Sequence, residues 1–124
     1  MVLDNEVALV IQRSWAPGTH LTNSQQGGSC TLVAPEDLHP DARTLAVSAA
    51  NIIGSEVAGA NVIQHWTGGR WYVLDVNANP AIVTGAFVEH KIAAYLSFVR
   101  NRLRDAPDRR HDVQAPPKPT SRPR

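Results

Sequence analysis

The stretch Leu74-Asp75-Val76-Asn77-Ala78-Asn79-Pro80 closes a strand-like apolar segment that begins at Trp71. Side chains on a strand alternate between its two faces, so Asp75 and Asn77 share one face. A carboxylate and an amide oxygen at this spacing suit a hard cation such as Mg²⁺, which keeps its other positions for water and phosphate oxygens. The competing interpretation is that Asp75 and Asn77 only terminate the strand, since both residue types are common in turns.

The segment before this stretch predicts a hairpin. Residues 58–66 and 70–76 are both strand-like, and Thr67-Gly68-Gly69 supplies a turn between them. Asn61 lies on the first of these strands and comes within reach of Asp75 in plausible registers. Three oxygen ligands would then converge on one place, although a one-residue slip would turn Asn61 to the other face.

The remaining segments predict an α+β fold with a mainly antiparallel sheet and two helices packed on it. Val7 to Arg13 and Ser29 to Val33 are strand-like, with acidic Glu36 and Asp37 ahead of a helix that starts at Pro40 and ends near Gly54. The apolar positions of that helix recur at helical spacing: Ala42, Leu45, Ala46, Ala49, Ile52 and Ile53. A second amphipathic helix is expected over 86–103, with the stripe Ile92, Tyr95, Leu96 and Val99.

A second polar segment, Thr22 to Ser29, contains Asn23 and the pair Gly27-Gly28. Glycines permit close approach of the backbone, whose N–H groups can face an anion or a substrate carboxylate. The segment lacks the lysine and the following helix of a phosphate loop, so an ordinary loop is the competing interpretation. The five histidines show no ligand spacing with one another or with Cys30, and no nucleophile–base pair is apparent.

Taken in sequence order, these segments resemble the C-terminal part of an ATP-grasp carboxylate–amine ligase of the RimK-like branch. The matching pieces are Val7–Arg13, Thr22–Gly28, Pro35–Gly54, Ala58-Gly59-Ala60-Asn61 and Leu74–Pro80. The resemblance implies an ATP- and Mg²⁺-dependent ligase, with Mn²⁺ as an alternative metal. It would form peptide bonds in the manner of a glutamate ligase, through an acylphosphate, on a small amino-acid or peptide substrate.

Carried over by position, the resemblance assigns a role to each motif. Asn61, Asp75 and Asn77 would be metal ligands. Leu74 would lie against the nucleotide base, making Leu74, Asp75 and Asn77 the cofactor-binding set. Asn23, Gly27 and Gly28 would line the catalytic site where substrate and transferred phosphoryl group meet.

Three positions depart from the family pattern. Asn61 stands where the family usually has aspartate, Asp75 replaces the usual glutamate, and Ala81 stands where a glycine normally follows the proline. The first change removes a negative charge and the second shortens the ligand by one methylene, which together suggest weaker metal binding. A non-catalytic remnant or interaction module that retains the fold is therefore the alternative function.

Length and charge bound the organisation of the chain. With 12 basic and 11 acidic residues, its balance does not indicate a nucleic-acid or membrane partner, and a cytoplasmic location is expected. Residues 1–104 are expected to form part of an ATP-grasp domain, and the proline- and arginine-rich residues 105–124 a disordered tail. The phosphate-contacting lysines of the family have no counterpart, so either a second chain supplies the other half or the sequence is a truncated product. A homodimer is the other expected partner, because it would cover apolar surface left exposed without that half.

Overall fold

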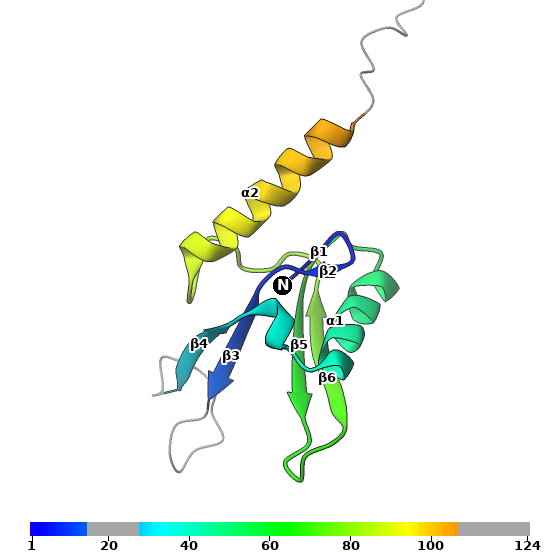
Figure 1. The fold of residues 1–124 in the computed structure, drawn as a ribbon, viewed down its shortest axis with the longest axis vertical. Coiled ribbons are helices and arrows are strands. Elements are labelled where there is room, and N and C mark those ends of the chain that lie inside the picture. The colour runs from blue at the N-terminus through cyan, green and yellow to red at the C-terminus, as the bar shows by residue number, and fades with distance from the viewer. Residues whose placement is uncertain (15–27, 107–124) are drawn as a thin grey trace, which may run out of the picture.

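The computed structural model describes residues 1–14 and 28–106 of the 124-residue chain. It combines antiparallel strands with two α-helices, which confirms the predicted α+β fold class (Figure 1). Their bounds are β1 Val2–Leu3, β2 Glu6–Val7, β3 Val10–Ser14, β4 Ser29–Val33, the 3₁₀ helix η2 Pro35–Asp37, α1 Pro40–Ile52, β5 Val57–Gln64, β6 Trp71–Asn77 and α2 Val88–Asp105. One sheet has the order β2-β1-β5-β6, and β3 pairs with β4 in a separate two-stranded sheet.

Helix α1 covers one face of β5 and β6, and small residues make the contact. The helix buries four alanines, Ala42, Ala46, Ala49 and Ala50, and β5 meets them with the fully buried Ala58. Short side chains let a helix approach a sheet closely, and the valines of the strands fill the space around them. The expectation that Ile52 belongs to the buried stripe is wrong, because Ile52 points away from the sheet and is 85% exposed.

Both ends of α1 follow the sequence signals. His39 caps the helix by accepting a hydrogen bond from the Asp41 backbone N–H at 3.2 Å, and Pro40 occupies the first turn. Gly54 adopts φ +65° just beyond the helix, as a C-terminal cap requires. Glu36 and Asp37, expected near the start of this helix, instead form the separate turn η2, and Asp41 is the acidic residue of the first turn of α1.

The strand predicted over Val7–Arg13 is interrupted. Residues 8 and 9 leave the ladder because their backbone N–H groups both donate to the Met1 carbonyl, at 3.0 and 3.4 Å. The chain therefore ends β2 at Val7, turns at Leu9, and begins β3 in the other sheet at Val10. The unpredicted hairpin β1–β2 turns through Asp4 and Asn5, which both have positive φ, a conformation that these residue types tolerate best after glycine.

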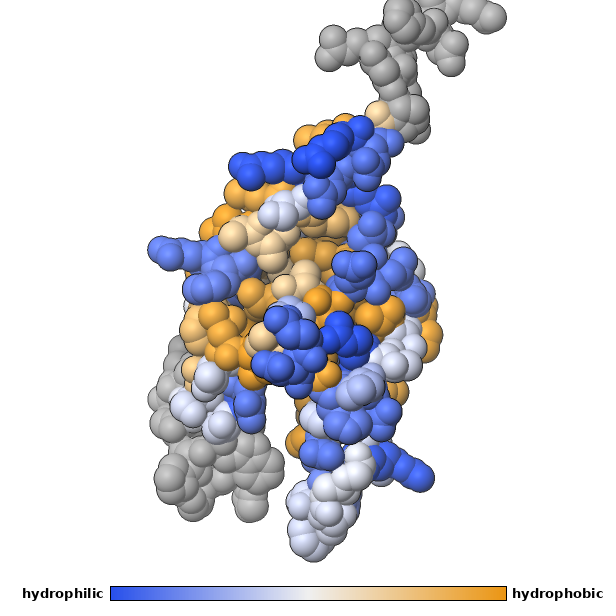
Figure 2. All heavy atoms as spheres, viewed as in Figure 1, coloured by the Kyte–Doolittle hydropathy of each residue, from blue (hydrophilic) through white to orange (hydrophobic). Residues whose placement is uncertain are grey.

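Helix α2 extends well beyond the sheet (Figure 1). It begins at Val88 and ends at Asp105, about half a turn later than predicted at each end, and residues 107–124 lie outside the described part of the chain. Its one buried residue is Lys91, so the predicted apolar stripe remains partly open to solvent. In Figure 2, hydrophobic side chains gather beneath and beside α2, among charged ones.

Candidate functional site

The β5–β6 hairpin brings two of the predicted ligands directly opposite each other. Asn61 of β5 is the cross-strand partner of Asp75 of β6, and Gly59 is the partner of Asn77. Residues opposite each other in an antiparallel pair project to the same face, with β-carbons about 5 Å apart. Asn77 lies two residues beyond Asp75 and shares that face, so the hairpin places all three candidate ligands on one surface.

This surface is the side of the hairpin that α1 does not cover. Ala60 and Val76 form the cross-strand pair between Gly59–Asn77 and Asn61–Asp75. Both pack against the core cluster that includes Ala46 and Ala50 of α1. Alternation along the strands then directs Asn61, Asp75 and Asn77 to the opposite side, where all three are exposed. The ligands therefore keep their oxygens accessible to a bound cation.

A β-bulge interrupts the hairpin next to Asp75. The pairing shifts from Asn61–Asp75 to Val62–Val73, which leaves Leu74 without a partner on β5. Bulges re-aim side chains and are enriched beside functional sites. Leu74 is 67% exposed, an unusual position for a leucine in a strand, and it lies immediately beside the three polar side chains.

The hydrogen bond that the Asn77 side chain accepts is compatible with both interpretations of this residue, as a strand-terminating turn former and as a metal ligand. Its Oδ1 accepts a bond from the Asn79 backbone N–H at 2.8 Å, which is the turn-forming contact expected of a strand-terminating asparagine. An amide oxygen has two lone pairs, so one remains available for a cation. The same bond fixes the orientation of the side chain and holds the start of the loop that follows β6.

Gly59 and Lys91, which the sequence motifs do not mark as site residues, hold this loop in place. A β-carbon at Gly59 would come within 3.1 Å of the Pro80 Cβ, so the loop folds back closely over β5. Lys91, at the start of α2, donates from Nζ to the Ala81 carbonyl at 2.6 Å and to the Thr84 carbonyl. A glycine inside a strand is a known signal of close backbone approach, whereas no local pattern marks Lys91 as a buried anchor.

The remaining predicted site residues belong to the segment between β3 and β4. Asn23 and Gly27 lie outside the described residues, and Gly28 directly precedes β4. The last pair of the β3–β4 ladder is Ser14 with Ser29, so this ladder fixes both ends of the segment. The role of Asn23, Gly27 and Gly28 near the substrate stays a prediction.

The cation-binding capacity of the surface rests on amide oxygens and a single carboxylate. Across residues 1–14 and 28–106, no three His, Cys, Asp or Glu side chains are grouped in a way that could hold a metal ion. Asp75, Asn61 and Asn77 form an all-oxygen donor set with one negative charge, which suits Mg²⁺ or Mn²⁺ and not a thiophilic metal. The donor chemistry therefore fits a weakly held magnesium ion.

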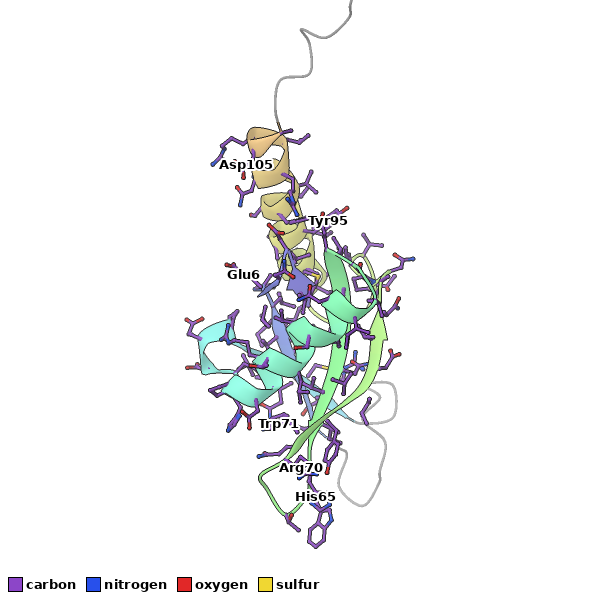
Figure 3. All side chains as sticks on the ribbon, turned by 90° about the vertical axis from the view of Figure 1, so that its right-hand side faces the viewer. Glu6, His65, Arg70, Trp71, Tyr95 and Asp105 are labelled. Atoms are coloured by element: carbon purple, nitrogen blue, oxygen red, sulfur yellow. The ribbon has the colours of Figure 1, made fainter. Side chains whose placement is uncertain are left out.

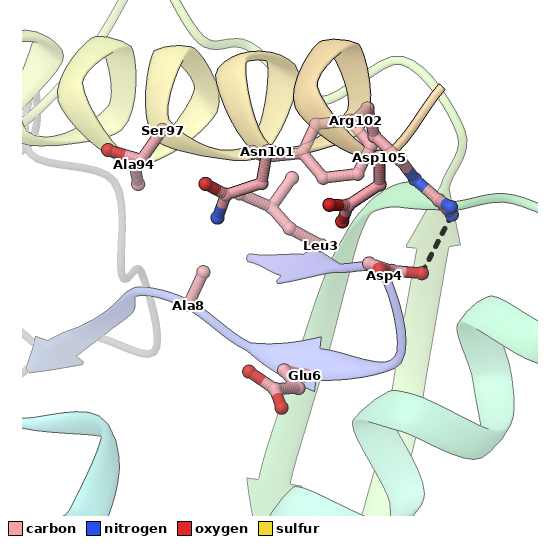
Figure 4. A pocket seen from close by; sticks show the side chains of 10 residues that line it. Leu3, Asp4, Glu6, Ala8, Ala94, Ser97, Asn101, Arg102 and Asp105 are labelled. Carbon is pink, nitrogen blue, oxygen red and sulfur yellow. Dashed lines mark hydrogen bonds and ion pairs between the residues drawn. The ribbon is translucent and has the colours of Figure 1, made fainter. Parts of the chain in front are cut away.

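A separate acidic pocket of about 410 Å³ lies between α2 and the β1–β2 hairpin (Figure 4). Its lining includes Leu3, Asp4, Glu6, Phe98, Asn101 and Asp105. Arg102 bridges its rim by donating to Asp4 Oδ1 at 2.8 Å and to Glu56. None of the predicted site residues contributes to this pocket, so the motif residues and this pocket are distinct features of the surface.

The hairpin tip lies at the opposite end of the molecule from the end of α2. Figure 3 shows His65 and Arg70 at the tip and Asp105 at the far end. Trp71, at the base of the tip, packs against the His39 ring with centroids 5.7 Å apart. This contact fixes the hairpin against the start of α1, whereas Asp75 and Asn77 lie toward the other end of β6.

Comparison with known sequences gives the class of protein that this hairpin and motif define. The RimK-like ATP-grasp domain family matches residues 1–96, and the chain belongs to this family. A probable alpha-L-glutamate ligase 1 of Shewanella amazonensis (strain ATCC BAA-1098 / SB2B) is 32% identical over 108 residues, which are 86% of this chain and 34% of that protein. These findings confirm the resemblance inferred from the motifs.

Two further relatives carry the same description. A probable alpha-L-glutamate ligase 2 of Hahella chejuensis (strain KCTC 2396) is 36% identical over 81 residues, covering 65% of this chain and 25% of that protein. A probable alpha-L-glutamate ligase of Parasynechococcus marenigrum (strain WH8102) is 32% identical over 112 residues, covering 82% of this chain and 23% of that protein. The chain thus spans about a quarter to a third of the length of these relatives. In the described residues, no helix combines the length and apolar character needed to cross a membrane.

Proposed function

We propose that this chain is the C-terminal, metal-binding part of an ATP- and Mg²⁺-dependent carboxylate–amine ligase. The observation that carries the proposal is the register of the β5–β6 hairpin, which sets Asn61 opposite Asp75 and leaves both on the face that α1 does not cover. Membership of the ATP-grasp family and the glutamate-ligase relatives support the same reaction class. The substrate class is a small amino acid or peptide, with glutamate as the first candidate.

In this proposal each residue of the hairpin has a task. Asp75 supplies the charged ligand, and the amide oxygens of Asn61 and Asn77 complete the protein's share of the cation's coordination. A bound Mg²⁺ or Mn²⁺ would neutralise phosphate charge on ATP. Leu74 offers an exposed apolar contact to the nucleotide base, which explains why a strand leucine is directed outward by a bulge.

The contacts behind the hairpin keep these ligands oriented. The Asn79 N–H fixes the Asn77 side chain, Pro80 packs on Gly59, and Lys91 holds the following loop. Ligands that are fixed before the nucleotide arrives lose less conformational entropy on binding. Asn23, Gly27 and Gly28 remain proposed contacts to the substrate and the transferred phosphoryl group.

The missing part of the site defines the proposed partner. The relatives are about three to four times as long as the segments matched here, and ATP-grasp sites hold nucleotide between two subdomains. The other half would come from a second chain or from a longer form of this one. A cytoplasmic location is part of this proposal.

A non-catalytic module that retains the fold is the second candidate function. The observation that favours it is the charge of the site, because one carboxylate and two amides attract a divalent cation less than two carboxylates would. Such a module would keep the hairpin and α1 intact and bind ATP poorly.

Calorimetric titration of ATP with Mg²⁺ into the 124-residue chain separates the two candidates. The ligase proposal predicts Mg²⁺-dependent ATP binding that Asp75→Ala abolishes while the circular dichroism spectrum stays unchanged. Asp37→Ala, which removes an equally exposed carboxylate from η2, serves as the matched control and should bind normally. Absence of binding at millimolar nucleotide would contradict ATP binding by this chain alone and favour the non-catalytic module.

A further inference from the structure

The face of the β5–β6 hairpin that α1 does not cover carries apolar side chains as well as the polar motif. Val62 and Val73 are cross-strand partners, and Val62 packs against the core beneath α1. Strand alternation therefore directs the neighbouring cross-strand pair, Ile63 and Tyr72, to the uncovered face. Ile63 is partly buried and Tyr72 is 44% exposed, so an aromatic ring lies open to solvent on this surface.

Ile63, Tyr72 and Leu74 form an apolar patch that continues into the proposed cation site. The pair Ile63–Tyr72 comes first from the hairpin tip, then the bulged Leu74, then the pair Asn61–Asp75. The two pairs are two residues apart on β5, which corresponds to roughly 7 Å along the strand. Among the described residues, α1 and β5 are the only elements in extensive contact with β6, and neither covers this face. The patch is therefore open to a ligand.

We propose that Tyr72 is a nucleotide-binding residue, on whose ring the base of a nucleoside triphosphate stacks. This inference rests on the proposed function, because the cation held by Asp75 would anchor the triphosphate at one end of the patch. A nucleotide anchored there extends its sugar and base toward the apolar surface. In the opposite direction, the uncovered face continues with the exposed polar Asn77, which offers no apolar contact.

The size and surroundings of the patch favour a planar base as its occupant. Polar residues bound it on both sides, with Asn61 and Asp75 at one end and His65 and Arg70 at the hairpin tip (Figure 3). Three side chains offer room for one ring system, far less than a protein interface needs. Offset stacking on an aromatic ring suits a flat base, and Leu74 adds an apolar contact beside it.

A contact of this kind binds a base without selecting which base it is. Of the three side chains in the patch, only Tyr72 can form a hydrogen bond, through its hydroxyl group. Every nucleobase has a π-face, so stacking tolerates different bases. GTP should therefore bind this chain about as tightly as ATP, and any selection between them requires contacts outside the patch.

Ribose 5-triphosphate separates the base contact from the cation site, because it has the sugar and phosphates of ATP without the base. In calorimetry with Mn²⁺, the wild-type chain should bind ATP roughly tenfold more tightly than ribose 5-triphosphate, the gain expected from stacking one base. Equal affinities would overturn the base contact and leave the cation site intact. Absence of binding by both compounds would overturn the cation site, and the stacking inference with it.

Substitutions assign the contact to the Tyr72 ring. Tyr72→Ala should weaken ATP binding roughly tenfold and leave ribose 5-triphosphate binding unchanged, whereas Tyr72→Phe keeps the ring and should retain the wild-type ATP affinity. Trp66→Ala is the matched control, since it removes an aromatic side chain that is 88% exposed at the hairpin tip, outside the patch. It should bind ATP normally.

Nuclear Overhauser effects between the base protons of ATP and the Tyr72 ring test the same contact in the wild-type chain, with Mg²⁺ as the cation. This measurement does not depend on the folding of any variant. Their absence, or an unchanged ATP affinity of Tyr72→Ala, would overturn the proposal.

Discussion

Replacing Asn61 by aspartate tests whether the two hairpin strands form one cation site. The substitution sets a second carboxylate directly opposite Asp75 without changing side-chain size. Without metal, like charges at a cross-strand pair should destabilise the fold by about 0.5 to 1 kcal/mol. For a domain of this size, that loss should lower the melting temperature by roughly 2–8 °C.

Metal should reverse the sign of this effect. A negative charge about 4 Å from a divalent cation gains about 2 kcal/mol in water, and salt reduces this figure. Asn61→Asp should therefore bind Mn²⁺ roughly tenfold to thirtyfold more tightly than the wild-type chain. The bound ion should also recover the lost thermal stability, because binding to the folded state alone stabilises it.

Electron paramagnetic resonance of free Mn²⁺ measures the affinity, and thermal unfolding with and without Mn²⁺ measures the stability. Gln64→Glu is the matched control, since it adds the same charge to β5 at the end of the strand, opposite Trp71 and remote from Asp75. It should leave the Mn²⁺ affinity unchanged. Equal Mn²⁺ affinity of Asn61→Asp and the wild-type chain would refute the claim that Asn61 and Asp75 face one ion.

Three further predictions concern the support of the site and the N-terminus. Gly59→Ala should destabilise the fold by about 1 kcal/mol and lower Mn²⁺ affinity, because the new methyl group displaces Pro80. Denaturant unfolding and Mn²⁺ titration test this. Unchanged stability and unchanged affinity would contradict the close packing of Pro80 on Gly59. Lys91→Met should lower the free energy of unfolding by about 1 to 3 kcal/mol, because it leaves the Ala81 and Thr84 carbonyls unpaired. Hydrogen exchange in the loop before α2 should become faster. Unchanged exchange would show that Lys91 does not anchor the loop. Burial lowers the pKa of the Met1 amine from 8.0 to about 6, so the unfolded chain binds the extra proton between these values and stability should rise with pH across that window, by about 2 to 3 kcal/mol in total. Denaturant unfolding of the chain with Met1 retained, at pH 5.5 and 8.5 with and without N-acetylation, isolates this effect; an equal pH dependence of both forms would exclude it.

The sequence predicts the hairpin well because its signals are local. Two strand-like runs enclose Thr67-Gly68-Gly69, and both glycines adopt positive φ in the turn. The turn sets the register of residues 62–64 with 71–73, but that register alone would pair Asn61 with Leu74, and the bulge at Leu74 is what brings Asp75 opposite Asn61. The bulge at Leu74 was not predicted, because nothing in the pattern 71–77 marks an unpaired residue.

The N-terminal region shows where local patterns fail. Residues 7–13 are continuously compatible with a strand, yet hydrogen bonds from residues 8 and 9 to Met1 divide the segment between two sheets. That choice depends on tertiary contacts that periodicity does not encode. The β1–β2 hairpin did carry a usable signal, the Asp4-Asn5 pair between two short apolar runs.

Helix α2 illustrates a different limit. Its amphipathic pattern correctly predicts a helix, but the pattern alone does not state which surface covers its apolar stripe. In the structure, Lys91 is buried and donates hydrogen bonds to backbone carbonyls, whereas Leu96 and Leu103 remain exposed. A hydrophobic stripe therefore identifies a contact face without identifying its partner.

Paramagnetic line broadening tests the central claim most directly, namely that Asn61, Asp75 and Asn77 form one cation site. Substoichiometric Mn²⁺ is added with ATP to the ¹⁵N-labelled chain, and the amide signals are followed by NMR. The signals of residues 59–61 and 75–79 should broaden first, and Asp75→Ala should remove this pattern. Broadening that begins instead at Asp4, Glu6 and Asp105 would place the cation in the acidic pocket beside α2 and contradict the account.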